Sequence, residues 1–336
     1  DLITDILVPD LEKFEPGAIR GEFNSTQRKL DVEVGIMKLQ YTDIIIDNLL
    51  LKVKASKRSI DCKLSVDDMQ KGNIHVDGLA WDGYIKQDSI TTELTVYDSI
   101  DREKYFIGGM LMSKDQGYQL HISPDQLKLN YEPWQISDNN LVQFGKGPVL
   151  IQNMQLSRDE QRITITQQNN TRAMSFNFDA LELKTLSAIV SSNKILVDGQ
   201  LDGDVHLQPQ SNEGTAVHAA LNIQGLTISE QPWGNLQMRA NQVSHDRFDI
   251  DVKLEGEQAA LNIDGYYVTT PSTSQMNFAI DINRLNLAII EPLTAGQLKN
   301  MTGELTGDMA ITGSPQVPSI LGALRFKEAR FVPTFA

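Results

Sequence analysis

Apolar and polar residues alternate over most of this chain of 336 residues. In the stretch that begins at Lys29, for example, Leu30, Val32 and Val34 each follow a charged residue. A period of two places the apolar side chains on one face of a β-strand and the polar side chains on the other. Similar runs, separated by turn residues, recur along the chain and predict an all-β protein of about twenty short strands.

A sheet with one apolar face must shelter that face by closing into a barrel, packing as a sandwich or curling into a trough. The alternation runs from end to end without a Pro/Ser-rich linker or a change in composition. This continuity favours the trough, because each unit of a repetitive sheet then contacts only its neighbours. We therefore predict that residues 1–336 form one continuous segment of an elongated, U-shaped β-groove with an apolar interior and a few short helices.

The expected lining of this groove consists of the apolar positions in the alternating runs. These residues are Leu30, Val32, Val34, Ile36, Ile60, Leu64, Ile74, Val76, Leu94, Val96, Leu120, Ile122, Ile163, Ile165, Phe176, Phe178, Val205, Leu207, Leu221, Ile223, Phe248, Ile250, Val252, Leu261, Ile263, Phe278, Ile280, Leu324 and Phe326.

Several stretches depart from the alternation. Residues 2–14 carry apolar residues at mixed spacing and predict a short helix broken near Pro9. The run from Thr42 to Val53 is apolar on both faces, so we expect a cover on both sides, with the helix at 2–14 on one of them. Short helices are also expected within residues 185–191 and 287–298.

A phrase of the form Gly, any residue, apolar, any residue, Gly, acid, apolar occurs three times. The copies begin at Gly17, Gly199 and Gly303, and the last two, 104 residues apart, also share the sequence that precedes them. Paired glycines around an apolar residue are typical of a strand beside a tight bend. The copies predict degenerate repeat units that start near 17, 199 and 303.

The charge balance argues against two classes of partner. The chain carries 44 acidic and 30 basic side chains, a formal net charge of −14 and a pI near 4.8. Nucleic acids require a basic face, so no nucleic-acid partner is expected. The same balance argues against docking flat on an anionic membrane surface.

No motif predicts catalysis, and we expect no enzyme activity, no cofactor and no metal site. The single cysteine, Cys62, lies in an alternating run, which is typical of a small packed residue. Asp198, Asp202 and Asp204 surround the middle glycine phrase, but only one acid recurs in all three copies, which is too few oxygens for a cation. The sequence contains no dinucleotide, P-loop or nucleophile-elbow motif.

The closing stretch, from Met301 to Pro333, resembles the AsmA-like repeat of TamB-type proteins. In that family a Gly-x-apolar-x-Gly strand and an apolar-x-Gly element precede a Pro-x-apolar-x-Gly element. The corresponding segments here are Gly303 to Gly307, Ile311 to Gly313 and Pro318 to Gly322. Residues 134–166 are similar to the family as well, whereas the first glycine phrase lacks the proline-containing tail and the middle copy has Pro209 near its expected second glycine.

This resemblance implies a β-taco groove that shelters phospholipid acyl chains, spans the periplasm of a diderm bacterium between the inner and outer membranes, and serves outer-membrane biogenesis. It also implies a parent chain anchored in the inner membrane and an Omp85-family (TamA-like) outer-membrane partner reached through that parent chain. The sequence has no run of about 20 apolar residues, and it stops within an apolar run at Phe331 to Ala336. We therefore expect an internal or C-terminal-half fragment of such a protein.

Two other classes of function fit parts of the pattern. A scaffold or chaperone would template outer-membrane β-barrel proteins by β-augmentation at an exposed sheet edge. A glycan-binding β-helix would need clustered aromatic residues or paired acids on one face, and the chain has 7% aromatic residues with no repeated acid pair. Binding that follows acyl chains supports the lipid groove, whereas binding that follows client edge strands supports the scaffold.

Overall fold

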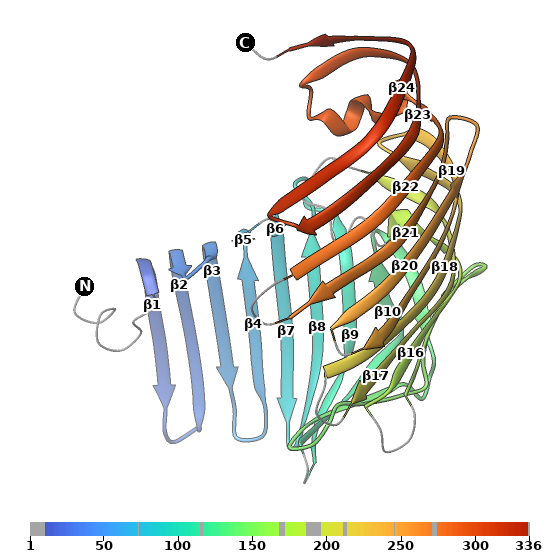
Figure 1. The fold of residues 1–336 in the computed structure, drawn as a ribbon. Coiled ribbons are helices and arrows are strands. Elements are labelled where there is room, and N and C mark those ends of the chain that lie inside the picture. The colour runs from blue at the N-terminus through green and yellow to red at the C-terminus, as the bar shows by residue number, and fades with distance from the viewer. Residues whose placement is uncertain are drawn as a thin grey trace. The chain divides into compact units, whose positions relative to one another are not determined.

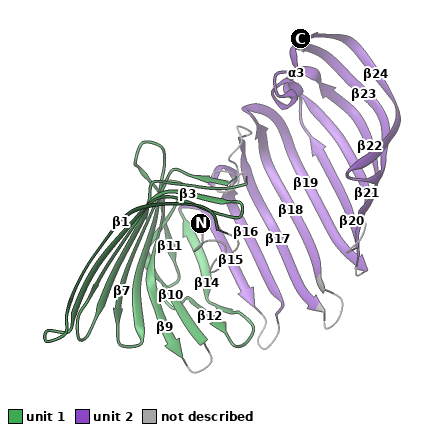
Figure 2. Ribbon diagram, turned by 90° about the vertical axis from the view of Figure 1, so that its left-hand side faces the viewer, with its two compact units in different colours: residues 1–158, 188–193 green, residues 159–187, 194–336 purple. Residues whose placement is uncertain are grey.

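A computed structural model describes residues 11–72, 74–114, 117–167, 172–185, 196–210, 214–244, 246–270 and 274–334. Strands make up 80% of the structure and helices 4%. The described residues form two compact units, 11–158 (unit 1) and 159–334 (unit 2), which Figure 2 shows in different colours.

Unit 1 is a single layer of antiparallel strands. Its strands are β1 (Leu11–Asn24), β2 (Lys29–Tyr41), β3 (Ile44–Ala55), β4 (Ile60–Val66), β5 (Asp68–Lys71), β6 (Ile74–Val76), β7 (Gly78–Lys86), β8 (Ser89–Tyr97), β9 (Glu103–Lys114), β10 (Gly117–Leu129), β11 (Glu132–Ile136), β12 (Leu141–Gly145), β13 (Leu150–Gln152) and β14 (Met154–Arg158). The ladder runs from β1 through β2, β3, β4, β7, β8 and β9 to β10, and β5 and β6 branch from β3. Strand β10 also pairs with β11 and β12.

Unit 2 is a simple antiparallel meander in which each strand pairs with the next. Its elements are β15 (Gln161–Gln167), β16 (Met174–Glu182), β17 (Val197–Gln210), β18 (Gly214–Ile228), β19 (Gln231–Ser244), β20 (Arg247–Glu255), β21 (Ala259–Thr269), β22 (Ser274–Asn286), the helix α3 (Leu287–Ile290), the 3-10 helix η1 (Glu291–Thr294), β23 (Leu298–Ser314) and β24 (Val317–Pro333). Figure 1 shows these long strands side by side.

The predicted fold class, an all-β groove with a few short helices, is confirmed. Among the described residues β1 pairs only with β2 and β24 only with β23, so the sheet stays open at both edges. The strands range from 3 to 17 residues and are often longer than predicted. One reason is that bulges join runs that look separate in the sequence, as in β10, where the register shifts between Ile122 and Leu127.

The glycine phrases lie inside long strands, at bulges, and not beside tight bends as predicted. Gly203 and Gly307 have φ angles of 138° and 132°, and a Cβ on either glycine would lie 2.1 Å from a carbonyl oxygen of the next strand. Both positions therefore require glycine. The preceding strand carries a register shift in each copy, after Phe178 in β16 and after Ile282 in β22, so the structure repeats at the same spacing of 104 residues as the sequence.

Two of the helix predictions are wrong within the described residues. Residues 11–14 belong to β1, because pairing with β2 gives their backbone a partner; residues 2–10 lie outside the described part. No helix covers the run from Thr42 to Val53 among the described residues: it forms β3, whose neighbours β2, β4 and β5 lie in the same sheet. Asn48, with a φ of 53°, interrupts the alternation of this strand.

The other two helices occur near their predicted places. Residues 183–185 are helical, and the remainder of the stretch 185–191 lies outside the described residues. Over 287–298 the chain forms α3 and η1 and then enters β23. Asn286 caps α3 by accepting a hydrogen bond from the backbone N–H of Ala288 (2.9 Å).

The main core of unit 2 lies where α3 packs on the apolar face of the sheet. Leu287 and Ile289 of the helix are 3% exposed and belong to one buried cluster with Leu254, Ile282 and Leu305. A helix of 4 residues is too short to be stable by itself. Its position is therefore maintained by these apolar contacts.

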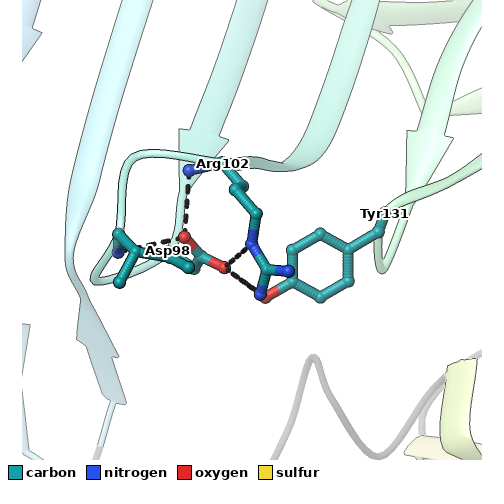
Figure 3. A network of polar contacts seen from close by, with 4 residues as sticks. Asp98, Arg102 and Tyr131 are labelled. Atoms are coloured by element: carbon teal, nitrogen blue, oxygen red, sulfur yellow. Dashed lines mark hydrogen bonds and ion pairs between the residues drawn. The ribbon is translucent and has the colours of Figure 1, made fainter.

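In unit 1 a polar network ties together the loops at one end of the strands (Figure 3). Asp98 accepts hydrogen bonds from the backbone N–H of Arg102 (2.9 Å), from its Nε (3.0 Å) and from the hydroxyl of Tyr131 (2.8 Å). Burial alone would raise the pKa of Asp98, but these hydrogen bonds and one from the backbone of Ile100 outweigh it and hold the pKa well below its usual range. The network joins the β8–β9 turn to the β10–β11 turn.

Candidate functional site

The register of unit 1 places its apolar residues on one face in rows that cross the strands, because side chains of directly paired residues point to the same side. The rim row contains Leu30, Ala55, Ile60, Ile85, Ile90, Leu111, Leu120, Val142 and Ile151. The cysteine row contains Val32, Val53, Cys62, Gly83, Thr92, Gly109 and Ile122, and the tryptophan row contains Val34, Leu51, Leu64, Trp81, Leu94, Ile107, Leu127 and Trp134. Val66, Leu79, Val96 and Tyr105 follow in a fourth row.

Unit 2 has the same organisation. The phenylalanine row contains Ile165, Phe176, Val205, Ala219, Ala240, Ile250, Gly265, Phe278, Ile311 and Ile320. The middle row contains Ile163, Phe178, Gly203, Leu221, Met238, Val252, Ile263, Ile280, Met309 and Gly322, and the helix row contains Leu181, Leu201, Ile223, Leu236, Leu254, Leu261, Ile282, Gly307 and Leu324. Leu207 and Phe248 continue the face toward the hairpin tips, and Phe326 continues it beyond the helix row.

The structure brings the sequence-predicted lining residues together within each unit, with two exceptions. Ile74 and Val76 lie in the β5–β6 branch, opposite Lys71 and Met69. The interruption of β3 at Asn48 separates that branch from the rows of unit 1. None of the 29 predicted residues is buried in the core: all are half-buried or exposed, which leaves the face accessible in both units.

The helix α3 divides the apolar face of unit 2 into a covered and an open part. Leu254 and Ile282 of the helix row belong to the buried cluster of α3 and are 4% and 6% exposed. Leu181 and Leu201 of the same row are also buried but lie outside that cluster. The phenylalanine and middle rows contain no buried residue. Their ten strands, β15 to β24, form an open apolar strip about 43 Å long at the usual strand spacing.

Several residues of the rows were missed in the sequence because glycines interrupt the alternation around them. Trp81 is the clearest case: its ring lies over Gly83, where an added Cβ would be 2.7 Å from the indole, and its Nε1 donates to Thr92 Oγ1 (2.6 Å). The indole thus satisfies its polar group while presenting an apolar surface. The Gly-Gly pair at 108–109 similarly obscures β9, which supplies Tyr105 to the face; burial raises the pKa of Tyr105 to about 12 and keeps it uncharged.

Cys62 lies half-buried in the middle of this face, between Val53 and Gly83 on the neighbouring strands. Burial, followed by the charge of Asp61, raises the pKa of its thiol. The thiol is therefore protonated at neutral pH and behaves as an apolar group.

The opposite face of each sheet is charged. In unit 1 cross-strand ion pairs join Lys52 to Glu33 (3.4 Å) and Lys63 to Asp82 (2.6 Å). In unit 2 a hollow of about 600 Å³ is lined by carboxylates, including Asp251 and Asp264, which face each other across β20 and β21. A hydrogen bond with Asp251, helped by desolvation and by the charge of Asp251, raises the pKa of Asp264. Within the described ranges no group of three His, Cys, Asp or Glu side chains has an arrangement that could hold a metal ion.

An open antiparallel sheet with one accessible apolar face and one charged face, repeated over two units, defines the class of β-groove proteins. Comparison with known protein families identifies the family within this class. The family model described as "TamB, N-terminal domain" matches residues 3–326. The chain belongs to the TamB family. The match is to the N-terminal domain of the family, whereas the sequence resemblance had indicated an internal or C-terminal-half segment. No curated protein and no solved structure matches the chain.

Family membership links the chain to the translocation and assembly module, which includes an Omp85-family partner, and to the periplasmic side of the cell envelope. Among the described residues, no helix has the length and apolar character needed to cross a membrane.

Proposed function

We propose that the apolar face is a lipid-transport groove that shelters phospholipid acyl chains between the inner and outer membranes, within a parent chain anchored in the inner membrane. The observation that supports this is the continuity of the accessible rows. In the phenylalanine and middle rows of unit 2, all ten strands contribute an apolar residue or glycine, and none contributes a charge.

Acyl chains gain from such a surface. Each methylene removed from water contributes about 0.8 kcal/mol, and a headgroup left at the edge of the sheet keeps its hydration. Because the rows are uncharged and similar from strand to strand, a chain meets no position at which binding is much tighter than at the next. Lipid can therefore move across the strands without a large barrier.

The direct test is lipid analysis of the purified chain. Solvent extraction followed by mass spectrometry is expected to release phospholipid well above an equally acidic β-protein of similar size. Occupancy is read independently from Cys62, whose alkylation by a neutral maleimide is expected to slow when phospholipid is added. Absence of both signals would contradict the proposal.

A second function, a scaffold for client β-strands, is favoured by one observation. Among the described residues, β24 is paired along one side only, and Val317 and Leu321 of this strand are 76% and 70% exposed. An open, apolar edge is a template for a further strand. Peptides from outer-membrane β-strands would then compete with one another at β24 and would leave alkylation of Cys62 unchanged.

A further inference from the structure

The hairpin tips at one end of the unit 1 strands form a basic rim. The topology brings together the tips at residues 25–29, 56–59, 86–89 and 145–149 with the ends of β9 and β10 at Lys114 and Gly117, because the strands that lead into them, β1, β3, β7, β9 and β12, all run toward the same end. These tips carry Arg28, Lys29, Lys57, Arg58, Lys86, Lys114 and Lys146, against Asp88 and, outside the described residues, Asp115.

The opposite end of the same strands is acidic. Its turns and strand ends carry Asp43, Asp67, Asp68, Asp77, Asp98, Asp101, Glu103 and Glu132, against Lys71, Arg102, Lys104 and Lys128. The two ends of the unit 1 strands therefore carry opposite net charge, with the apolar face between them. The net charge of −14 conceals a local excess of positive charge at one rim.

The charges of the basic rim are available to a ligand. All seven basic side chains are exposed, and none of them forms an ion pair within the part of the chain that the structure describes. The nearest acids on the strands, Glu22, Asp31 and Asp61, lie in one cross-strand row with Lys54 on the charged face. These acids therefore point away from the apolar side, as do Lys29 and Lys86.

The apolar face begins directly beside the basic rim. Leu30 and Ile85 of the rim row directly adjoin the tips in the sequence, whereas the side chains of their neighbours Lys29 and Lys86 alternate to the charged face. The turn residues Arg28, Lys57, Arg58 and Lys146 therefore supply the positive charge at this edge of the apolar face. From Leu30 to Ile36 the face extends about 20 Å along the strand. The acyl chains of one membrane leaflet span about 15 Å. An amphiphile with a negative headgroup and chains of ordinary length fits this arrangement.

We propose that the basic rim of unit 1 binds the headgroup of an anionic phospholipid whose acyl chains lie along the strands on the apolar face. This inference rests on the proposed lipid groove and adds an orientation and a headgroup preference to it. The headgroup lies at the hairpin tips, because the acidic end would repel it. Anionic phospholipids bind more tightly than zwitterionic ones with the same chains.

The test compares phosphatidylglycerol with phosphatidylethanolamine of identical acyl chains, each with a fluorescent label on one chain, added below the concentration at which it forms vesicles. The rim variant carries Arg28→Gln, Lys57→Gln, Arg58→Gln and Lys146→Gln in the full chain. The control variant carries Arg162→Gln, Lys253→Gln, Arg325→Gln and Lys327→Gln. These four residues lie on the charged face of unit 2, and the control changes the net charge equally. Thermal melts establish that both variants are folded.

The unsubstituted chain is expected to bind phosphatidylglycerol roughly threefold to tenfold more tightly than phosphatidylethanolamine at low salt, as expected for a few exposed charge pairs. The preference should shrink at high salt. The rim variant should bind both lipids with the affinity of phosphatidylethanolamine, and the control should keep the preference. Equal binding by the unsubstituted chain, or a preference that survives in the rim variant, would overturn the proposal.

Other outcomes separate the alternatives. If neither lipid binds or protects Cys62 from alkylation, the groove itself is refuted, together with this inference. If the rim variant loses flotation with phosphatidylglycerol vesicles while dispersed lipids show no preference, the rim docks on a membrane surface and the proposal fails. If free glycerol phosphate displaces phosphatidylglycerol at equal concentration, the rim is a phosphate site and does not recognise lipid.

Discussion

A single charge in the phenylalanine row tests whether acyl chains use this face. In Ile165→Asp a carboxylate replaces a half-buried side chain that lies opposite Phe176. The adjacent Thr166 is exposed, pairs with Ser175 and points to the charged face, so Thr166→Asp is a matched control with the same charge on the same strand.

The expected loss of affinity for phospholipid follows from the surroundings of Ile165. In the empty groove the carboxylate reaches water, so the fold should lose little stability. A bound acyl chain would cover it, and a carboxylate in a hydrocarbon environment costs about 2.5–3.5 kcal/mol. Because the groove is open on one side, we expect a loss of about 2 kcal/mol, or about thirtyfold in affinity for phospholipid. Thr166→Asp should leave the affinity unchanged.

Displacement of a chain-labelled phospholipid measures this affinity, and a thermal melt checks that each variant is folded. Protonation removes the charge, so binding by Ile165→Asp should recover as the pH falls below about 4 to 5. Equal affinities for the folded Ile165→Asp and Thr166→Asp variants at neutral pH would refute an acyl path along this row.

The remaining predictions concern stability and reactivity. Ile289→Ala should destabilise unit 2 by about 2–4 kcal/mol in denaturant unfolding, because it empties a core site beneath α3; a loss below about 0.5 kcal/mol would show that the helix is not held by this contact. Cys62 should react with maleimide more slowly than a free thiol at pH 8, because burial raises its pKa, and the rates should converge in denaturant. Asp264→Asn should raise Tm at pH 7 by about 1–2 °C and lose this advantage as the pH falls through the raised pKa of Asp264, where protonation relieves the repulsion with Asp251; an unchanged Tm at neutral and acid pH would contradict it. Asp98→Asn should lower Tm near neutral pH and have less effect at acid pH, since the lowered pKa of Asp98 gives stability that is lost as the pH falls through it.

The sequence predicts the faces of this protein well, because alternation is a local property. Ile163 and Ile165 share a face in any antiparallel pairing, and the structure adds only which residues stand opposite them, here Phe178 and Phe176. The same reasoning fails where the alternation is broken. In β7 the alternation of apolar and polar residues is interrupted at Gly83. The indole of Trp81 lies over this glycine and completes the apolar face there.

Other features depend on contacts that no local pattern contains. The apolar residues of 11–14 have helix-like spacing, but these residues form a strand because their backbone pairs with β2. The cover of the helix row by Leu287 and Ile289 requires knowledge of where α3 returns to the sheet. The basic rim could not be predicted from the sequence either. Arg28 and Lys146 lie at the same end of the sheet only because of the order and direction of the strands between them.

The repeat of 104 residues has a consequence for the length of the groove. From β17 to β23 one repeat advances the sheet by six strands, or about 29 Å at the usual strand spacing. Six is an even number, so each copy enters the sheet in the same direction, and its glycine and bulge meet the same kind of neighbours. Duplication or loss of a whole repeat would leave every hydrogen-bonded register intact, whereas a change by an odd number of strands would reverse the direction of all that follow. The sheet of such a protein can thus grow in steps of about 29 Å, and the repeat sets the unit of length for the groove.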